Sequence, residues 1–228
     1  MKALDRFWKW PDGLVWHLTR VFAERSRRRR FGIFMREMRP TPFDRILDIG
    51  VGEGVGRGVN FFEERYSWRG QVTAVALADI PTFRHAYPEI ALIVGDGRRL
   101  PFADRSFDIA FSNAVIEHVG SGKDQRAFVA EACRVADRVF LSVPNRWFPM
   151  DTHTMIPFAH WFPLRWRNAV YRTLGRRSYA SEKALHLIGG RELLRLVPEG
   201  WNGRIIRQRW FGMTANLNLI IEHRAATH

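Results

Sequence analysis

The sequence predicts an α/β domain built on a doubly wound, mostly parallel sheet. An apolar segment at residues 45–49 runs into a glycine-rich turn at 50–54, and a helix is expected behind it over residues 55–66. Further short apolar segments at 71–76 and 91–94 are expected to form the next two strands. Continuous apolar strands of this length are typical of parallel sheets that helices cover on both faces. A chain of 228 residues is long enough for one such domain with a full core.

Residues 1–44 precede the first strand and form a basic, aromatic arm. A helix is indicated there by apolar residues at helical spacing: Leu14, Leu18, Val21 and Phe22. Arg25 and the run from Arg27 to Arg30 continue this helix as a cationic end, and prolines at 40 and 42 close the arm. Two roles fit this pattern and are compatible with each other. The helix lies at a membrane interface, or it docks on the domain as a lid over the substrate pocket.

The formal net charge of +13 is concentrated in the two ends of the chain. Residues 1–45 hold twelve Lys/Arg against five Asp/Glu, and residues 145–228 hold thirteen against five. The middle, residues 46–144, holds eleven against thirteen and is close to neutral. This distribution favours an anionic partner, either a lipid surface or a nucleic acid. A solvated basic surface with no partner fits the same charges.

Targeting signals and cysteine usage favour a cytoplasmic location, with membrane association left open. The N-terminus lacks the continuous apolar segment of a secretory signal, and no apolar run approaches the roughly 20 residues that span a bilayer. Cys133 is the only cysteine, which excludes an internal disulfide. It lies in a segment with helical amphipathicity, so we expect it in the core rather than at a reaction centre.

The turn after the first strand has the composition of a nucleotide-binding loop. Gly50, Gly52 and Gly54 let the backbone turn tightly and approach a ligand without a Cβ in the way. The amides of the following helix would face the same ligand, and Asp48 is placed to order the loop or to meet a cationic ligand group. The spacing departs from the dinucleotide fingerprint because Val55 stands where the third glycine belongs. An ordinary glycine-rich turn is the alternative.

Longer motifs give this chain a family resemblance. Asp-x-Gly-x-Gly-x-Gly at residues 48–54 resembles motif I of the class I S-adenosylmethionine-dependent methyltransferases. Residues 100–113, with Leu-Pro-Phe and Ser-Phe-Asp, and residues 114–119 resemble the branch often called type 11. The resemblance covers residues 45–145 and implies a seven-stranded sheet within a methyltransferase domain at 45–228. A fifth strand is expected at 139–143, an acceptor-side insert at 145–200, and a closing antiparallel hairpin within 203–222.

The resemblance implies S-adenosylmethionine as cofactor and a set of residues that bind it. Asp96 would meet the adenine amino group, and Gly97 would let the ring lie close. The acid that usually takes the ribose hydroxyls is replaced by Ala76, and Asp79 is the candidate substitute. Losing that charge-assisted hydrogen bond would cost about 1.5–3 kcal/mol. The full predicted set is Asp48, Gly50, Gly52, Gly54, Asp79, Asp96, Gly97 and Asn113.

The insert after the fifth strand is rich in aromatic residues and proline, which rules out one long helix. An apolar loop of this length is expected to cover the acceptor pocket, and it suits a bulky acceptor of prenyl or lipid-linked type. The same aromatic and arginine residues also suit a membrane-interface belt, or an extra patch of core: Trp147, Phe148, Trp161, Trp166, Arg165 and Arg167.

The chemistry of methyl transfer asks little of the protein. The nucleophile must be aligned with the S–CH₃ bond, and a hydroxyl acceptor must lose a proton. No metal is required. Candidate bases are His118, His153 and Asp151. His118 follows the fourth strand, where the loop would face the methyl group, but a structural role for it is equally compatible.

Three functions follow from these patterns. The first is an O- or C-methyltransferase acting on a small or lipid-like acceptor. The second is a degenerate methyltransferase domain that serves as a non-catalytic binding or scaffold subunit, which Ala76 suggests. The third, nucleic-acid methylation, ranks lowest. Residues 113–116 read Asn-Ala-Val-Ile rather than the Asn/Asp-Pro-Pro-Tyr/Phe motif of base methylation, and no cysteine nucleophile stands in a suitable setting.

Overall fold

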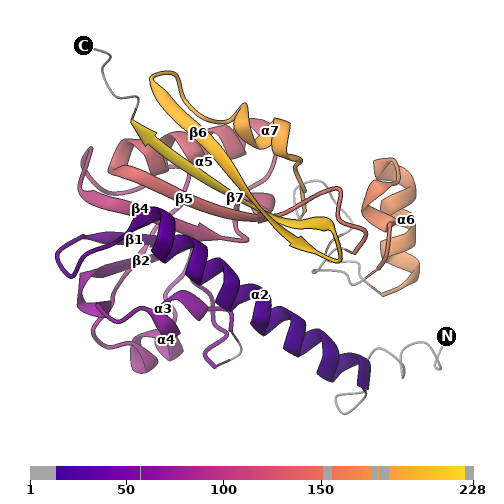
Figure 1. Ribbon diagram of the computed structural model, residues 1–228, viewed down its shortest axis with the longest axis horizontal. Helices are drawn as coiled ribbons and strands as arrows, with labels where there is room; N and C mark the ends of the chain where they lie inside the picture. Colours follow the sequence, from indigo (N-terminus) through magenta and orange to yellow (C-terminus); the bar gives the residue numbers. More distant parts are fainter. Residues whose placement is uncertain (1–13, 57, 151–155, 176–178, 180–184, 224–228) are drawn as a thin grey trace.

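A computed structural model describes residues 14–56, 58–150, 156–175, 179 and 185–223 (Figure 1). Its centre is a seven-stranded sheet in the order β3-β2-β1-β4-β5-β7-β6. β1 to β5 run parallel, whereas β7 pairs antiparallel with both β5 and β6. The expected doubly wound, mostly parallel sheet is therefore confirmed. The strands are β1 (Ile46–Ile49), β2 (Val72–Ala76), β3 (Ala91–Val94), β4 (Phe107–Asn113), β5 (Ala136–Pro144), β6 (Trp201–Trp210) and β7 (Met213–His223).

Helices cover both faces of the sheet (Figure 1). The α-helices are α2 (Leu14–Met38), α3 (Phe61–Arg65), α4 (Pro81–Ala86), α5 (Gly122–Val135), α6 (Leu164–Thr173) and α7 (Gly190–Leu194). Short 3₁₀ helices lie at η1 (Arg69–Gln71), η2 (Ile116–His118) and η3 (Ala159–Trp161). Within the described residues, no helix is both long enough and apolar enough to cross a bilayer.

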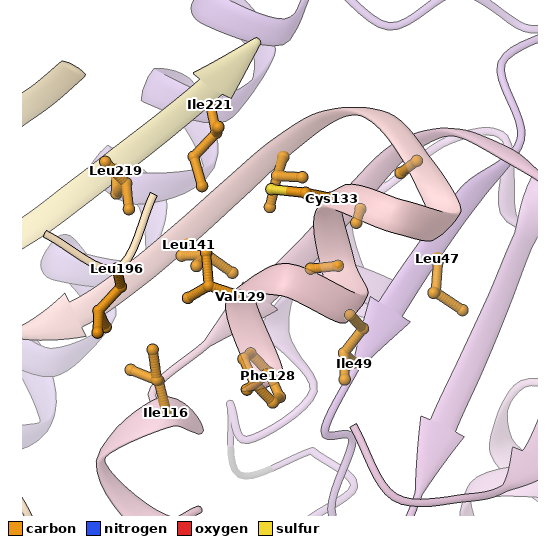
Figure 2. Packing of buried hydrophobic residues seen from close by; sticks show 14 of the residues in the cluster. Leu47, Ile49, Ile116, Phe128, Val129, Cys133, Leu141, Leu196, Leu219 and Ile221 are labelled. Carbon is orange, nitrogen blue, oxygen red and sulfur yellow. The ribbon is translucent and has the colours of Figure 1, made fainter. Parts of the chain in front are cut away.

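One face of the sheet is covered by α5, whose amphipathic sequence predicts this burial. Phe128, Val129 and Cys133 pack in a single apolar cluster with Leu47 of β1 and Leu141 of β5 (Figure 2). Burial raises the pKa of the Cys133 thiol to about 12, so the group stays protonated and unreactive. Cys133 is thus a core residue, as expected.

The other face is covered by the second half of α2 together with α3 and α4. Phe34 of α2 is fully buried, and its ring centroid lies 5.1 Å from that of Phe62. The rings of Phe111 on β4 and Phe140 on β5 lie 5.4 Å and 5.5 Å from it, edge to face. The arm is therefore packed against the sheet through its C-terminal half.

Two expected helix boundaries were wrong. The helix expected over residues 55–66 begins only at Phe61, because Gly56 and Gly58 adopt φ of 70° and 69°, which a right-handed helix does not accommodate. The arginine run does not end the arm helix, since α2 continues to Met38. Burial of Ile33 and Phe34 against the sheet explains the continuation, and the arginines lie mid-helix.

The remaining strands agree with expectation more closely. β3 has the expected bounds, while β5 and both strands of the closing hairpin extend beyond them. The β6–β7 hairpin is antiparallel as expected, with a register shift between Gln208 and Arg209. The two hairpin strands alternate less cleanly in hydrophobicity, which is why their ends were less predictable from the sequence.

Candidate functional site

The carboxyl ends of β1 to β4 and the loops that follow them lie at one edge of the sheet. The amide of Gly50 donates to the carbonyl of Val75 at 2.8 Å, which holds the loop after β1 beside the end of β2. The amide of Gly95, just after β3, donates to the carbonyl of Ala76 at 2.8 Å. In doubly wound sheets this edge is where ligands bind, and most of the predicted site residues lie here.

The glycine loop at residues 50–54 packs too closely against its neighbours to carry side chains at Gly50 or Gly54. A Cβ on Gly50, which has φ of 103°, would lie 2.3 Å from Cγ2 of Val115. A Cβ on Gly54 would lie 2.3 Å from Cγ2 of Val59. The Asn60 side chain brackets Gly52, accepting from its amide at 3.0 Å and donating to its carbonyl at 2.8 Å. The loop is thus a fixed cradle whose backbone is open to close approach.

Beneath this cradle lies a pair of buried carboxyl groups. Asp48 at 5 % exposure and Glu63 of α3 at 0 % line a cavity of about 10 Å³, room for about one water molecule. Burial, together with the negative charge of Glu63, raises the pKa of Asp48 well above its usual range, and burial raises the pKa of Glu63. Two buried carboxylates cannot both ionise cheaply, so the pair retains a proton to higher pH than free carboxyls do. Sequence reasoning missed Glu63, which has no motif to mark it.

The ribose position departs from the family pattern in the structure as in the sequence. Ala76 ends β2 and is 5 % exposed. Asp79 is exposed, and its carboxylate accepts from Nε of Arg84 on α4 at 2.7 Å. Arg84 also donates to the carbonyl of Leu92 at 2.9 Å, which anchors the pair toward β3. The structure therefore directs Asp79 toward α4, although its carboxylate retains further acceptor capacity.

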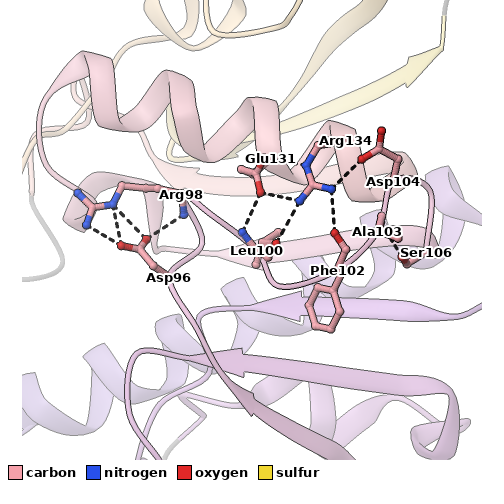
Figure 3. A network of polar contacts seen from close by, with 9 residues as sticks. All are labelled: Asp96, Arg98, Leu100, Phe102, Ala103, Asp104, Ser106, Glu131 and Arg134. Atoms are coloured by element: carbon pink, nitrogen blue, oxygen red, sulfur yellow. Dashed lines mark hydrogen bonds and ion pairs between the residues drawn. The ribbon is translucent and has the colours of Figure 1, made fainter.

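Asp96 and Gly97 lie in the loop after β3 (Figure 3). Arg98 donates to Asp96 from its backbone amide at 2.9 Å and from Nη2 at 2.6 Å. These hydrogen bonds lower the pKa of Asp96 and keep the carboxylate ionised and fixed. A Cβ on Gly97 would lie 2.5 Å from the ring of Phe128 and 3.0 Å from Ile49 Cγ2, so only glycine fits.

The same view shows why the Leu-Pro-Phe segment is held so firmly (Figure 3). Arg134 of α5 donates to the carbonyls of Leu100 and Phe102 at 3.1 Å and 2.8 Å. Its partner Glu131 accepts from Arg134 at 2.8 Å and from the amide of Leu100 at 2.8 Å. This clamp joins the loop after β3 to α5. The Glu131–Arg134 spacing of three residues on one helix was the available signal for it.

Asn113 ends β4, and its side-chain oxygen accepts a hydrogen bond from Arg30 of α2. Nε of Arg27, one turn earlier, donates to the carbonyl of Gly58 at 3.0 Å. Burial and the charge of Arg27 lower the pKa of Arg30 to about 10, against the opposing effect of Glu117. The arm thus reaches both the glycine loop and the end of β4. The spacing of Arg27 and Arg30 places them on one helix face, and this spacing was the available sequence signal for the contact.

Of the three candidate bases, His118 lies within the described residues. His118 is exposed at the end of η2, beside the buried Glu117. It follows β4, as expected. Asp151 and His153 lie outside the described residues.

Comparisons with known proteins agree with this geometry. Residues 47–138 match the protein family described as a methyltransferase domain. The demethylmenaquinone methyltransferase of Roseiflexus sp. is 32 % identical over 129 residues, which are 54 % of this chain and 50 % of that protein. The chain therefore spans about half the length of this curated relative.

Two solved structures share the fold across most of the chain. Magnesium protoporphyrin IX methyltransferase of Synechocystis, solved with S-adenosylhomocysteine, has a TM-score of 0.57 at 14 % identity, covering 98 % of this chain and 95 % of its own. Geranyl diphosphate C-methyltransferase of Streptomyces coelicolor has a TM-score of 0.54 at 13 % identity, covering 92 % and 85 %.

The sheet order and the glycine cradle at its carboxyl edge define the class I S-adenosylmethionine-dependent methyltransferase fold. Residues 47–138, which include the Leu-Pro-Phe and Ser-Phe-Asp segments, are similar to the type 11 methyltransferase family.

Proposed function

We propose that this chain is an enzyme that transfers a methyl group from S-adenosylmethionine to an oxygen or carbon atom of a small or lipid-like acceptor. The observation that carries the proposal is the glycine cradle, where a Cβ on Gly50 or Gly54 would collide with Val115 or Val59, so that the loop presents backbone without side chains. This cradle stands at the sheet edge where the fold binds its ligand, within the part of the chain that matches the methyltransferase family.

The residues at this edge fit the cofactor group by group. The loop at 50–54 would approach its amino-acid portion through backbone alone. Asp96, held ionised by Arg98, would accept from the adenine amino group, and Gly97, which packs against Phe128 and Ile49 without a side chain, would lie beside the ring. Asn113 and Asp48 complete the predicted set, with Asp79 as the candidate for the ribose. When bound, the cofactor supplies an electrophilic methyl group on a sulfonium.

The protein's own part in the reaction is alignment and exclusion of water. Arg27 and Arg30 hold α2 against the glycine loop and the end of β4, so the arm closes one side of the transfer site. For a hydroxyl acceptor, His118 is the base we favour, with Asp151 and His153 as further candidates. An acceptor that reacts at an activated carbon needs less help from a base.

Apolar character in the insert supports a lipid-like acceptor. The curated relative is named a demethylmenaquinone methyltransferase, and one structural neighbour is named a geranyl diphosphate methyltransferase. Exposed aromatic side chains follow β5 in this chain, including Trp147 at 63 % and Trp166 at 60 %. We place the reaction in the cytoplasm beside an anionic membrane, and we rank nucleic acid low as a substrate.

A second function is favoured by one observation. Ala76 offers no acceptor for the ribose, and Asp79 is engaged by Arg84. These features fit a degenerate domain that acts as a non-catalytic binding or scaffold subunit.

Calorimetric titration with S-adenosylmethionine and S-adenosylhomocysteine separates the two functions. Micromolar binding of either ligand to the folded chain is the expected result, after which acceptors would be screened. No binding at millimolar ligand, from protein with a cooperative thermal transition, would contradict the enzyme proposal and favour the scaffold.

A further inference from the structure

The segment that leads into α6 presents apolar side chains to solvent without a break. Residues 161–166, Trp-Phe-Pro-Leu-Arg-Trp, are all exposed. Four of the side chains are large and apolar: Trp161 at 41 %, Phe162 at 51 %, Leu164 at 44 % and Trp166 at 60 %. Phe158, just before them, is 49 % exposed, and its ring lies 5.0 Å from that of Trp161. We call residues 158–166 the aromatic tip. Contiguous exposure of this kind marks an interaction surface.

The aromatic tip is held in place by contacts that leave its apolar surface outward. Nε1 of Trp161 donates to the carbonyl of Arg146 at 2.9 Å, and the ring of His160 contacts the carbonyl of Phe148 at 2.9 Å. A separate small core under α6, with Tyr171 and Ala159 both buried, secures the helix. Phe162, Leu164 and Trp166 are not members of that core, so its packing does not explain why these exposed side chains are apolar.

Charge around the aromatic tip identifies the kind of partner. Residues 156–175 contain Arg165, Arg167 and Arg172 and no Asp or Glu. Figure 1 shows α6 at the same end of the molecule as the β6–β7 turn. That turn exposes Phe211 at 79 % and Met213 at 45 %, flanked by exposed Arg207 and Arg209. Tryptophan and arginine interleaved in this way suit the boundary between lipid headgroups and acyl chains of an anionic bilayer.

The position of the aromatic tip ties this surface to the proposed reaction. β5 ends at Pro144, at the carboxyl edge of the sheet, and Pro144 pairs with Asn216 near the start of β7. The aromatic tip follows β5 in the chain and the β6–β7 turn precedes β7, so both connect to the sheet at this edge. The cofactor cradle lies at that same edge. A bilayer contacted here would face the transfer site.

We propose that the aromatic tip, with the β6–β7 turn beside it, docks the protein on an anionic phospholipid bilayer and turns the transfer site toward it. The inference rests on the proposed function only for its purpose, the delivery of a lipid-like acceptor. Docking itself needs neither cofactor nor acceptor, so its failure would leave the methyltransferase assignment standing.

Vesicle flotation of the full chain tests this proposal, with phosphatidylcholine vesicles that contain or lack phosphatidylglycerol. We expect binding to the anionic vesicles that weakens as salt rises, and little binding to the neutral ones. Phe162→Ser combined with Trp166→Ser should weaken anionic vesicle binding about tenfold or more. Arg165→Gln combined with Arg172→Gln should weaken it about fivefold or more and reduce its salt dependence.

Phe43→Ser is the matched control, because Phe43 is 86 % exposed but precedes β1, at the opposite edge of the sheet. It should bind vesicles like the unchanged chain. Thermal unfolding and S-adenosylhomocysteine titration of each variant show that the fold and the cradle are intact. Equal vesicle binding by the Phe162/Trp166 variant would overturn the proposal. So would a dimer, seen by sedimentation velocity, that this variant turns into a monomer, since the surface would then join two copies of the chain.

Discussion

The guanidinium of Arg30 on α2 donates a hydrogen bond to the side-chain oxygen of Asn113 at the end of β4. This contact joins residues 83 positions apart in the chain. It places a cation from the arm directly over the strand end that is expected to face the transferred methyl group. Glu117, buried nearby, favours the charged form of Arg30. The arm therefore contributes a polar contact to the candidate site as well as packing.

Arg30→Met should destabilise the fold by about 2 kcal/mol, because it removes a favourable charge from beside the buried Glu117 and takes the Arg30 donor from Asn113. Urea denaturation measures the change. Arg28→Met is the matched control on the same helix: Arg28 is 70 % exposed and pairs only with Glu24 among the described residues, so its loss should cost less than about 0.5 kcal/mol. Equal effects of the two substitutions would show that Arg30 acts only as a surface charge.

Ala76→Asp should tighten S-adenosylmethionine binding about tenfold or more, by supplying the acceptor that the ribose lacks. Isothermal titration measures the affinity. Ala78→Asp, two residues further on and exposed, adds the same charge outside the strand and should change affinity little. Unchanged or weaker binding by Ala76→Asp would indicate that the ribose site has been rebuilt around other residues, Asp79 among them.

Gly52→Val should abolish binding of S-adenosylhomocysteine. A Cβ there lies 3.0 Å from Val59 Cγ1, and a branched side chain would fill the cradle that the ligand needs. Gly70→Val is the control, because a Cβ at Gly70 meets nothing within 4 Å and η1 lies away from the cradle. Full affinity in Gly52→Val, measured on protein that unfolds cooperatively, would remove the cofactor assignment from this loop.

Glu63→Gln should stabilise the protein in a pH-dependent way. The pKa values of Asp48 and Glu63 are both raised in the folded state. Their contribution to stability is therefore fully present below the pKa of an unfolded carboxyl and is lost as pH rises through the folded values. The substitution should add about 1–2 kcal/mol at pH 8 and close to nothing at pH 4. Denaturation curves at the two pH values test this, and a gain that is equal at both would exclude the shared proton.

The sheet was predictable because its strands carry local signals. β1, β2 and β3 are short apolar runs bounded by turn residues, and each was found within one residue of its expected bounds at Ile46–Ile49, Val72–Ala76 and Ala91–Val94. The start of α3 was not predictable from apolar spacing, since the positive φ values at Gly56 and Gly58 decide it. The periodicity of apolar residues carries no information about positive φ values, which glycine adopts readily.

The candidate site likewise contains residues that the sequence predicted and residues that it did not. The glycine cradle and the loop at Asp96 and Gly97 have family motifs, so the sequence placed them. Arg30 and Glu63 act through contacts between segments distant in the chain, and no local pattern encodes those contacts. Arg84 diverts Asp79 for the same reason. What the sequence missed is the set of polar partners that only the folded chain brings together.

The burial of Phe34 has a consequence for how the transfer site can open. Its ring is enclosed by Phe62, Phe111 and Phe140, so the second half of α2 cannot lift away without exposing the centre of one face of the sheet. An acceptor therefore has to reach the transfer site without displacing this half of the helix. A shortened chain beginning at residue 45 would lose a wall of the hydrophobic core.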